Sequence, residues 1–279
     1  MIVFRSAGES CEFRPGTDII RRDARDRVPD NRPATRLIIK LFITGICGRL
    51  GRAVAVEATA QGMSVEEIDL VPWPDNVSLP QHARVHMASY EDIATITPML
   101  MRCDAMVHTA GAHGAHLEQL DLSTFLEKNV MKIAAILEAA KGDGVRRVNL
   151  SSTMEILVCR DWTASGATLL NESSPPRTDS PYSISKLRME ELASQFALRH
   201  DLAVSCNRYA GFGWVPDEQL GPRLLARTLS PIDAASAAIL AVVNLELRGE
   251  TFLIAPAAPH GLADIATALT NPHAVVERC

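Results

Sequence analysis

A short run of apolar residues that leads directly into three closely spaced glycines constrains this chain more than any other feature. Residues 37–43 read Leu-Ile-Ile-Lys-Leu-Phe-Ile, which is typical of a strand buried on both faces of a parallel sheet. Gly45 permits a tight turn, Gly48 lets the backbone approach a pyrophosphate, and Gly51 lets the next helix pack closely. We therefore predict a dinucleotide-binding site, with the phosphates at the N-terminus of a helix over residues 49–61.

The rest of the chain alternates between strand and helix patterns, which predicts an α/β fold with a doubly wound parallel sheet. The predicted strands cover residues 37–43, 64–70, 84–87, 105–108, 148–151, 203–207 and 251–254. The predicted helices cover residues 49–61, 91–101, 121–141, 182–199 and 231–244.

The composition excludes several classes of protein. The chain has 279 residues, 47% of them hydrophobic, which is ample for a large packed domain. A formal net charge of −5 gives no reason to expect nucleic acid as a partner, and no apolar run is long enough to span a membrane. The six cysteines lack the close spacing of a zinc site or a disulfide framework, which favours reduced thiols in the cytoplasm and no metal.

Residues 1–36 differ from the rest of the chain. They are rich in arginine, aspartate and proline, contain no lysine, and show little periodicity. Their acidic residues and the absence of an apolar core argue against a targeting peptide. We predict a disordered N-terminal extension over residues 1–36.

A tyrosine and a lysine four residues apart share one face of the predicted helix 182–199. The ammonium group of Lys186 is expected to stabilise a phenolate at Tyr182 and to lower the pKa of that phenol from about 10 towards neutrality. Such a phenol can exchange a proton with a substrate hydroxyl or carbonyl near pH 7. The same spacing also occurs on ordinary amphipathic helices, so the pair needs support from other residues.

Further polar residues fall where they can serve the same site. Thr153 and Ser152 follow the strand 148–151, where either hydroxyl could hold a substrate oxygen opposite the tyrosine. Asn129 falls on or beside the buried face of the helix 121–141, where an unpaired amide is costly. Asn129 is therefore either a site residue or a core residue whose amide is satisfied by neighbours.

Asp69 bears on the choice between NAD and NADP. It ends the second predicted strand, where a carboxylate can accept hydrogen bonds from the adenosine ribose and repel the extra phosphate of NADP. Arg49 and Arg52 lie close to the glycine turn and could attract that phosphate instead. These residues do not decide between NAD and NADP, but on balance they favour NAD.

From residue 37 to the end, these motifs resemble the short-chain dehydrogenase/reductase superfamily, in its extended epimerase/dehydratase-like branch. Residues 44–51 are similar to the family's cofactor turn, residues 107–111 to the segment that lines the cofactor, and residues 151–153 to its Ser/Thr run. Tyr182 and Lys186 match its active-site pair. The resemblance implies a Rossmann NAD(P)-binding domain over 37–279. Its small C-terminal substrate-binding lobe would be formed mainly by 155–180 and 209–279.

The resemblance also implies a role for each site residue. Tyr182 would transfer the proton, Lys186 would lower its pKa and bind the nicotinamide ribose, and Asn129 would hold a relay water. The catalytic hydroxyl would be Thr153, with Ser152 as the alternative. The expected cofactor-binding residues are Gly45, Cys47, Gly48, Arg49, Leu50, Gly51, Asp69, Thr109, Ala110, Gly111, Tyr182 and Lys186. Homodimers that form through a four-helix bundle are common in this branch.

We therefore expect an NAD(P)-dependent oxidoreductase that interconverts an alcohol and a ketone. Only about seventy residues follow Tyr209, so the substrate is expected to be a sugar, sugar acid or aminosugar-like metabolite, as in uronate-dehydrogenase-like members. The alternative is a nucleotide-sugar epimerase or 4,6-dehydratase with tightly bound NAD. Thr153-Met154-Glu155 resembles the Thr-x-Glu of some dehydratases, in which the glutamate removes a proton. Met154 lacks the acid that others carry at this position, and Glu155 also fits an exposed surface charge. A non-catalytic cofactor-sensing protein is the third hypothesis, which the presence of Tyr182 and Lys186 disfavours.

Overall fold

The computed structural model describes residues 3–6, 9–12, 39–73, 79–80, 83–142, 144–158, 170–211 and 229–255. Their centre is a seven-stranded sheet in which all neighbouring strands are parallel. In chain order, its strands are β3 (Lys40–Thr44), β4 (Ser64–Asp69), β5 (Ala83–Met87), β6 (Ala105–His108), β7 (Arg147–Thr153), β8 (Ala203–Tyr209) and β9 (Thr251–Ile254). In space the order is β5-β4-β3-β6-β7-β8-β9, which confirms the predicted doubly wound α/β fold.

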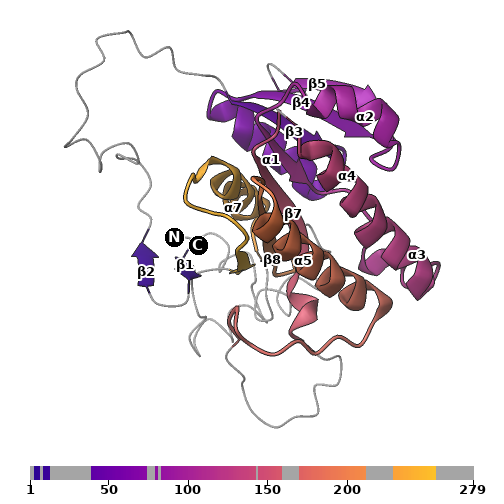
Figure 1. Cartoon of the computed structure of the whole chain (residues 1–279), viewed down its shortest axis with the longest axis vertical. Coiled ribbons are helices and arrows are strands. Elements are labelled where there is room, and N and C mark those ends of the chain that lie inside the picture. Colours follow the sequence, from indigo (N-terminus) through magenta and orange to yellow (C-terminus); the bar gives the residue numbers. More distant parts are fainter. Residues whose placement is uncertain are drawn as a thin grey trace, which may run out of the picture.

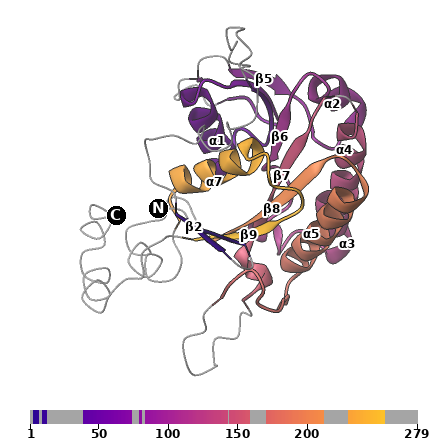
Figure 2. The ribbon, with the colours of Figure 1, turned by 60° about the vertical axis from the view of Figure 1, so that its left-hand side comes forward.

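Helices cover both faces of the sheet, as crossovers between parallel strands require. They are α1 (Arg49–Ala60), α2 (Ile93–Leu100), α3 (Leu122–Leu126), α4 (Lys132–Ala140), α5 (Pro181–Arg199) and α7 (Pro231–Val243). Figures 1 and 2 show α1 and α7 on one face and α2, α4 and α5 on the other. Because side chains alternate along a strand, Leu41 and Ile43 of β3 join the core under α1, whereas Phe42 joins the core under α4.

Strands β7 and β8 extend two residues further than predicted at their carboxyl ends. The apolar pattern stops at residues 151 and 207, but backbone pairing continues through Ser151 opposite Asn207 and Thr153 opposite Tyr209. Pairing carries the polar Ser152 and Arg208 into the sheet, and Thr153 and Tyr209 belong to residue types that strands favour. The Ser/Thr run therefore lies within a strand at the carboxyl edge of the sheet.

The predicted helix 121–141 is interrupted by a short π-helical segment. Helix α3 runs into η2 (Glu127–Met131), a π-helix, and then into α4. The wider turn places Asn129 on the buried side, with 1% of its surface exposed. Insertions of this kind occur often at functional sites, and no apolar periodicity reveals them in a sequence.

Parts of the sequence-based domain prediction lie outside the described residues. Within residues 1–36, strands β1 (Val3–Ser6) and β2 (Glu9–Glu12) form a separate antiparallel pair. For the remainder of that segment, the predicted disorder stays a prediction. Much of the predicted substrate lobe, at 159–169, 212–228 and 256–279, is likewise not described. Among the described residues, no helix has the length and apolar character needed to cross a bilayer.

Candidate active site

The glycine turn joins β3 to α1 and has the shape that a pyrophosphate requires. Gly45 has a φ of 75°, a left-handed conformation that favours glycine. A Cβ added to Gly51 would lie 2.2 Å from the carbonyl oxygen of Gly45, so the helix packs against the turn only because that side chain is absent. Gly48 is the N-cap of α1 and offers no side-chain cap. The first N–H groups of α1, from Arg49 onwards, have no partner within the helix and are suited to bind phosphate.

Asp69 at the end of β4 is tied directly to this turn. Its Oδ2 accepts a hydrogen bond from the backbone N–H of Cys47 at 2.8 Å. Its Oδ1 accepts from the N–H groups of Leu70 and Val71, at 2.7 and 3.2 Å. Each carboxylate oxygen has two acceptor sites, so Oδ2, which accepts one of these backbone bonds, is the oxygen better placed to accept from a ribose hydroxyl. The negative charge beside the turn fits NAD better than NADP.

The segment after β6 packs on the other side of the turn. The hydroxyl of Thr109 donates to the carbonyl oxygen of Thr44 at 2.8 Å. A Cβ added to Gly45 would lie 2.7 Å from the backbone nitrogen of Ala110, so the two segments are in direct contact. Gly111 has a φ of 137°. The structure therefore brings the predicted cofactor-binding segments together, and together they fit a dinucleotide.

Asn129 links the segment after β6 to helix α5 by hydrogen bonds. Its Oδ1 accepts a hydrogen bond from the N–H of Ala112 at 3.0 Å, and its Nδ2 donates to the carbonyl oxygen of the same residue at 2.8 Å. Nδ2 also donates to the hydroxyl of Ser185 at 3.0 Å. The amide is thus satisfied by the protein and positions both elements. The relay water that the resemblance implies for Asn129 stays a prediction.

Helix α5 begins where the site needs it. Ser180 is its N-cap and forms a reciprocal capping box with Ser183, and Pro181 occupies the first helical position. This start places Tyr182 in the first turn, beside the end of β7. The hydroxyl of Thr153 hydrogen-bonds to the Tyr182 phenol. One turn later, Nζ of Lys186 donates to the carbonyl oxygen of Ser151 at 2.8 Å.

The protonation of Tyr182 corrects one sequence-based prediction. Burial raises the pKa of the Tyr182 phenol above its ordinary value; the hydrogen bond from Thr153 opposes this rise, and the charge of Glu155 adds to it. The predicted net lowering of this pKa towards neutrality is therefore wrong for this structure, because burial dominates and the Lys186 ammonium bonds to the Ser151 carbonyl. Burial lowers the pKa of Lys186 to about 8, against the opposing effects of Cys206 and Glu190.

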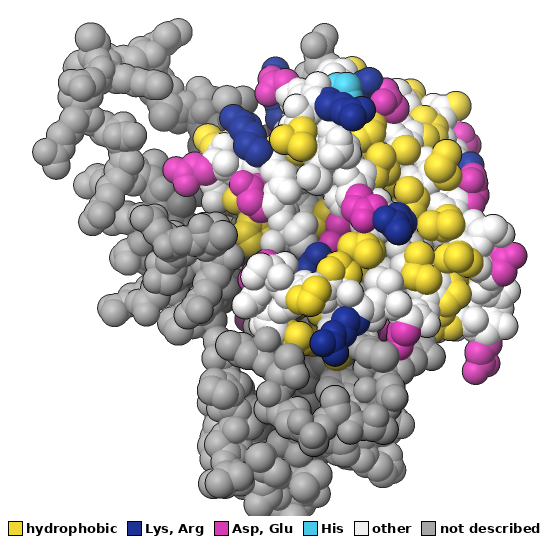
Figure 3. Space-filling view, turned by 60° about the horizontal axis from the view of Figure 1, so that its bottom comes forward, with side chains coloured by type: hydrophobic (Ala, Val, Ile, Leu, Met, Phe, Trp, Pro, Cys, Tyr) yellow, Lys and Arg dark blue, Asp and Glu magenta, His cyan; other side chains and the backbone are white. Residues whose placement is uncertain are grey.

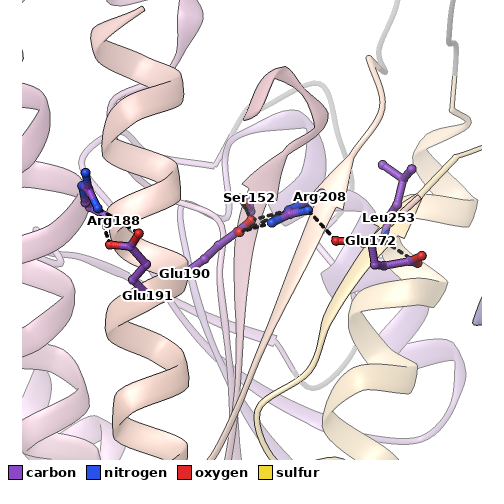
Figure 4. Close-up of polar contacts among 7 residues, drawn as sticks. All are labelled: Ser152, Glu172, Arg188, Glu190, Glu191, Arg208 and Leu253. Atoms are coloured by element: carbon purple, nitrogen blue, oxygen red, sulfur yellow. Dashed lines mark hydrogen bonds and ion pairs between the residues drawn. The ribbon is translucent and has the colours of Figure 1, made fainter. Parts of the chain in front are cut away.

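The structure distinguishes the two candidate hydroxyls on β7. Ser152 Oγ donates to Oε1 of Glu190 at 2.5 Å and lies on the face of the sheet that α5 covers (Figure 4). Thr153 points to the opposite side by strand alternation and contacts Tyr182. The geometry therefore favours Thr153 over Ser152 as the hydroxyl beside the phenol. The sequence reading missed Glu190, although its position eight residues after Tyr182 puts it on the same face of α5.

A carboxylate completes the group of polar side chains around Tyr182. Glu155 lies in η3 (Met154–Ile156), the short helix after β7, and its N–H donates to Thr153 Oγ1 at 3.2 Å. Gly114 faces both side chains: a Cβ placed there would lie 3.9 Å from Oε1 of Glu155 and 3.9 Å from Cδ1 of Tyr182. Thr153 thus contacts both the Tyr182 phenol and the backbone of Glu155, and the Glu155 carboxylate and the Tyr182 ring both lie beside the same glycine. Within the described ranges, no group of three His, Cys, Asp or Glu residues is arranged to hold a metal ion.

The sequence is similar to a known family of enzymes. The sequence model of the NAD dependent epimerase/dehydratase family matches residues 41–213. The UDP-glucose 4-epimerase of Streptomyces lividans is 25% identical over 166 residues, which cover 58% of this chain and 49% of that protein. The chain therefore spans about half the length of this curated relative.

Two solved structures share the fold. MoeE5 in complex with UDP-glucuronic acid and NAD superposes with a TM-score of 0.65 at 22% identity, covering 78% of this chain and 77% of its own. A double mutant of DesIV, the dTDP-glucose 4,6-dehydratase of Streptomyces venezuelae with NAD bound, gives a TM-score of 0.64 at 21% identity, covering 77% and 74%. At these identities, the likeness establishes the Rossmann-type fold.

Proposed function

The chain belongs to the NAD dependent epimerase/dehydratase family, and from this premise we propose that it modifies a sugar nucleotide with a cofactor retained through turnover. The observation that carries the proposal is the grouping of Thr153, Tyr182 and Glu155 at one end of β7. The relative and the two structures named above act on or bind UDP- or dTDP-sugars. The proposal thus takes up the alternative that the sequence left open and prefers it to the smaller sugar-like metabolite.

The residues around the glycine turn would hold NAD. The N-terminus of α1 would bind the pyrophosphate, and Asp69 would accept hydrogen bonds from the adenosine ribose. When bound, NAD supplies a two-electron acceptor to which a sugar carbon can pass a hydride and from which the hydride can return.

Tyr182 is the proposed acid/base for the sugar hydroxyl. Its raised pKa keeps the phenol protonated at neutral pH, which suits it to donate a hydrogen bond to the ketone oxygen in a dehydratase or to protonate that oxygen in an epimerase, where the hydride returns to the ketone carbon. In the forward direction, the phenol must first lose its proton. Positive charge on Lys186, one helical turn away, would stabilise the phenolate at that moment. Thr153 would hold the same substrate oxygen from the other side.

Glu155 favours a dehydratase over an epimerase. Once a ring hydroxyl has become a ketone, the C–H bond on the neighbouring carbon is acidified, and the Glu155 carboxylate would remove that proton. The same group would pass a proton to the hydroxyl on the next carbon, which would leave as water as a C=C bond forms. The returning hydride would then add to the carbon that lost the hydroxyl, and a proton would return to the carbon beside the ketone. An epimerase needs only the hydroxyl and phenol pair. Glu155 Oε1 and the Tyr182 ring each lie 3.9 Å from the Cβ position of Gly114, so the carboxylate lies near the proposed acid/base, which supports the extra step.

The test compares wild type with Glu155→Gln on UDP- and dTDP-hexoses, with products followed by mass spectrometry and NMR. A dehydratase yields a product lighter by one water, and the variant stops at or before the ketone. An epimerase yields a product of unchanged mass, and the variant keeps its rate. Net oxidation is the second candidate, because the contact between Thr153 and Tyr182 suffices for it without Glu155. Net oxidation would be recognised by NADH that accumulates in proportion to product.

A further inference from the structure

Helix α5 carries a third polar residue in register with the two candidate catalytic side chains. Tyr182, Lys186 and Glu190 follow one another at intervals of four residues and form one stripe along the helix. The stripe lies against residues 151–153 of β7, where each of its members contacts a different residue. Glu190 therefore extends the same stripe of contacts into the core.

Glu190 forms an ion pair that is closed to solvent. Its carboxylate accepts from Ser152 Oγ at 2.5 Å, from Arg208 Nε at 3.0 Å and from Arg208 Nη2 at 2.7 Å (Figure 4). The exposed fractions of the Arg208 and Glu190 side chains are only 9% and 6%. The cost of desolvating two charges offsets much of their attraction, so stability alone is a weak reason for such a pair.

Arg208 also reaches the loop that precedes α5. Its Nη1 donates to the carbonyl oxygen of Glu172 at 3.3 Å. The side chain of Glu172 in turn accepts from the N–H of Leu253 in β9 at 3.1 Å. This loop leads to Ser180, the N-cap of α5. The ion pair thus joins β7, β8, the loop and α5 immediately behind the candidate site (Figure 4).

Lys186 lies in the electrostatic field of this pair. Burial lowers the pKa of Lys186 to about 8, whereas Cys206 of β8 and Glu190 of α5 raise it. On the other sides, His108 of β6 and His113 of the following loop face Lys186; burial first, and then charges that include Lys186, lower the pKa values of both imidazoles. Glu190 is thus the acidic side chain that favours the ammonium form, and Arg208 partly neutralises it.

We propose that Glu190 and Arg208 are positioning residues for the reaction, and that their ion pair sets how readily Lys186 carries its charge beside Tyr182. The catalytic meaning of this inference rests on the proposed function. Its physical content concerns Lys186 alone, so it can be measured without a substrate.

The test follows Lys186 by NMR in protein made with lysine labelled with ¹³C at Cε. The chain has few lysines (Lys40, Lys128, Lys132, Lys141 and Lys186), so the spectrum is simple. Lys186→Arg identifies the signal of interest. The titration midpoint is then compared among wild type, Glu190→Gln, Arg208→Met and the double variant.

The inference predicts a specific order of midpoints. Glu190→Gln removes the nearby negative charge and leaves the guanidinium, so Lys186 titrates lowest, about one pH unit or more below wild type. Arg208→Met leaves the carboxylate uncompensated, so Lys186 titrates above wild type. The double variant leaves no unpaired buried charge, so its Lys186 midpoint should lie between those of Glu190→Gln and wild type. This variant keeps the test decisive if Arg208→Met does not fold.

An exposed ion pair away from α5 supplies the control. Arg146 and Asp201, which precede β7 and β8, lie 3.9 Å apart, and their side chains are 67% and 94% exposed. Asp201→Asn and Arg146→Met should leave the Lys186 midpoint unchanged because solvent screens that pair. Midpoints that stay fixed in the Glu190 and Arg208 variants, or that move in the same direction, would overturn the inference.

The same variants separate the inference from the proposed function. In active protein, the alkaline limb of the pH profile of kcat/KM should move with the Lys186 midpoint. If the NMR midpoints shift in a protein that converts no sugar nucleotide, the proposed function is contradicted but the effect of the ion pair on Lys186 is supported. If the protein converts a sugar nucleotide and the midpoints do not shift, the proposed function is supported and the effect on Lys186 is contradicted.

Discussion

The ammonium group of Lys186 donates a hydrogen bond to the carbonyl oxygen of Ser151 across 2.8 Å, although only 5% of the lysine is exposed. A buried lysine costs folding free energy whenever it is charged. Its pKa falls from 10.5 to about 8 in the folded protein. Between these two values the unfolded chain binds more protons, so stability increases with pH over this window and is lost as the pH falls towards 8.

Lys186→Met should therefore stabilise the protein below pH 8. The gain can reach about 3 kcal/mol, less the value of the lost bond to Ser151. It should shrink towards zero as the pH approaches 10.5. Urea denaturation of both proteins across this range measures the difference. A gain in stability that does not change with pH would show that the pKa of Lys186 is not lowered in the folded protein.

Tyr182→Phe should reduce turnover by about 10²- to 10⁴-fold. The substitution removes the proton donor and its bond with Thr153 but keeps the ring in place. Binding of NAD, followed by calorimetry, should stay close to wild type because the glycine turn and Asp69 are untouched. Full activity in this variant would exclude Tyr182 as the acid/base.

Asp69→Ala should weaken NAD binding and abolish discrimination against NADP. The variant removes both the negative charge and the acceptor for the N–H of Cys47. Asp69→Asn is the matched control, since it loses the charge but retains an oxygen for that bond. The asparagine variant should gain affinity for NADP with a smaller loss for NAD. Unaltered discrimination in both variants would shift the specificity to Arg49 and Arg52.

Gly45→Ala and Gly62→Ala form a matched pair that isolates the packing of the glycine turn. Both residues have a left-handed φ, 75° and 81°, so both substitutions carry a strain of about 1 kcal/mol. A Cβ at Gly45 would also lie 2.7 Å from Ala110, whereas a Cβ at Gly62 meets nothing within 4 Å. Thermal unfolding should show a much larger loss for Gly45→Ala, together with loss of NAD binding. Equal losses would contradict the contact between the two segments.

An apolar groove of about 430 Å³ between η2 and α5 gives the expected homodimer a testable surface. Figure 3 shows apolar side chains gathered over one side of the described surface. Met131 is 59% exposed and lines the groove; Leu198 is 76% exposed on α5 but does not line it. We predict that Met131→Glu produces monomers in analytical ultracentrifugation and that Leu198→Glu does not. A monomeric wild type would remove this surface as a dimer interface.

The sequence predicts the sheet well because its strands are buried on both faces and carry continuous apolar runs, as in β3. The glycine turn and the Tyr182–Lys186 spacing are local patterns, so they too could be predicted from the sequence. Contacts between distant segments could not be predicted in this way. No local pattern shows that Asn129 sits in a π-helical turn and clasps Ala112, or that Glu190 pairs with Arg208. The pKa of Tyr182 depends on how the whole fold buries the phenol. The spacing of Tyr182 and Lys186 along the helix therefore predicted the wrong direction for the pKa shift.

The most direct test of the central claim is the state and fate of the cofactor in freshly purified protein. We predict that NAD co-purifies with the chain at close to one equivalent and that a UDP- or dTDP-sugar is converted without added cofactor. The bound NAD should be unchanged in amount and redox state when the reaction ends. Protein that purifies without a nucleotide, and that converts a sugar only while consuming added NAD or NADP in proportion to product, would contradict this account.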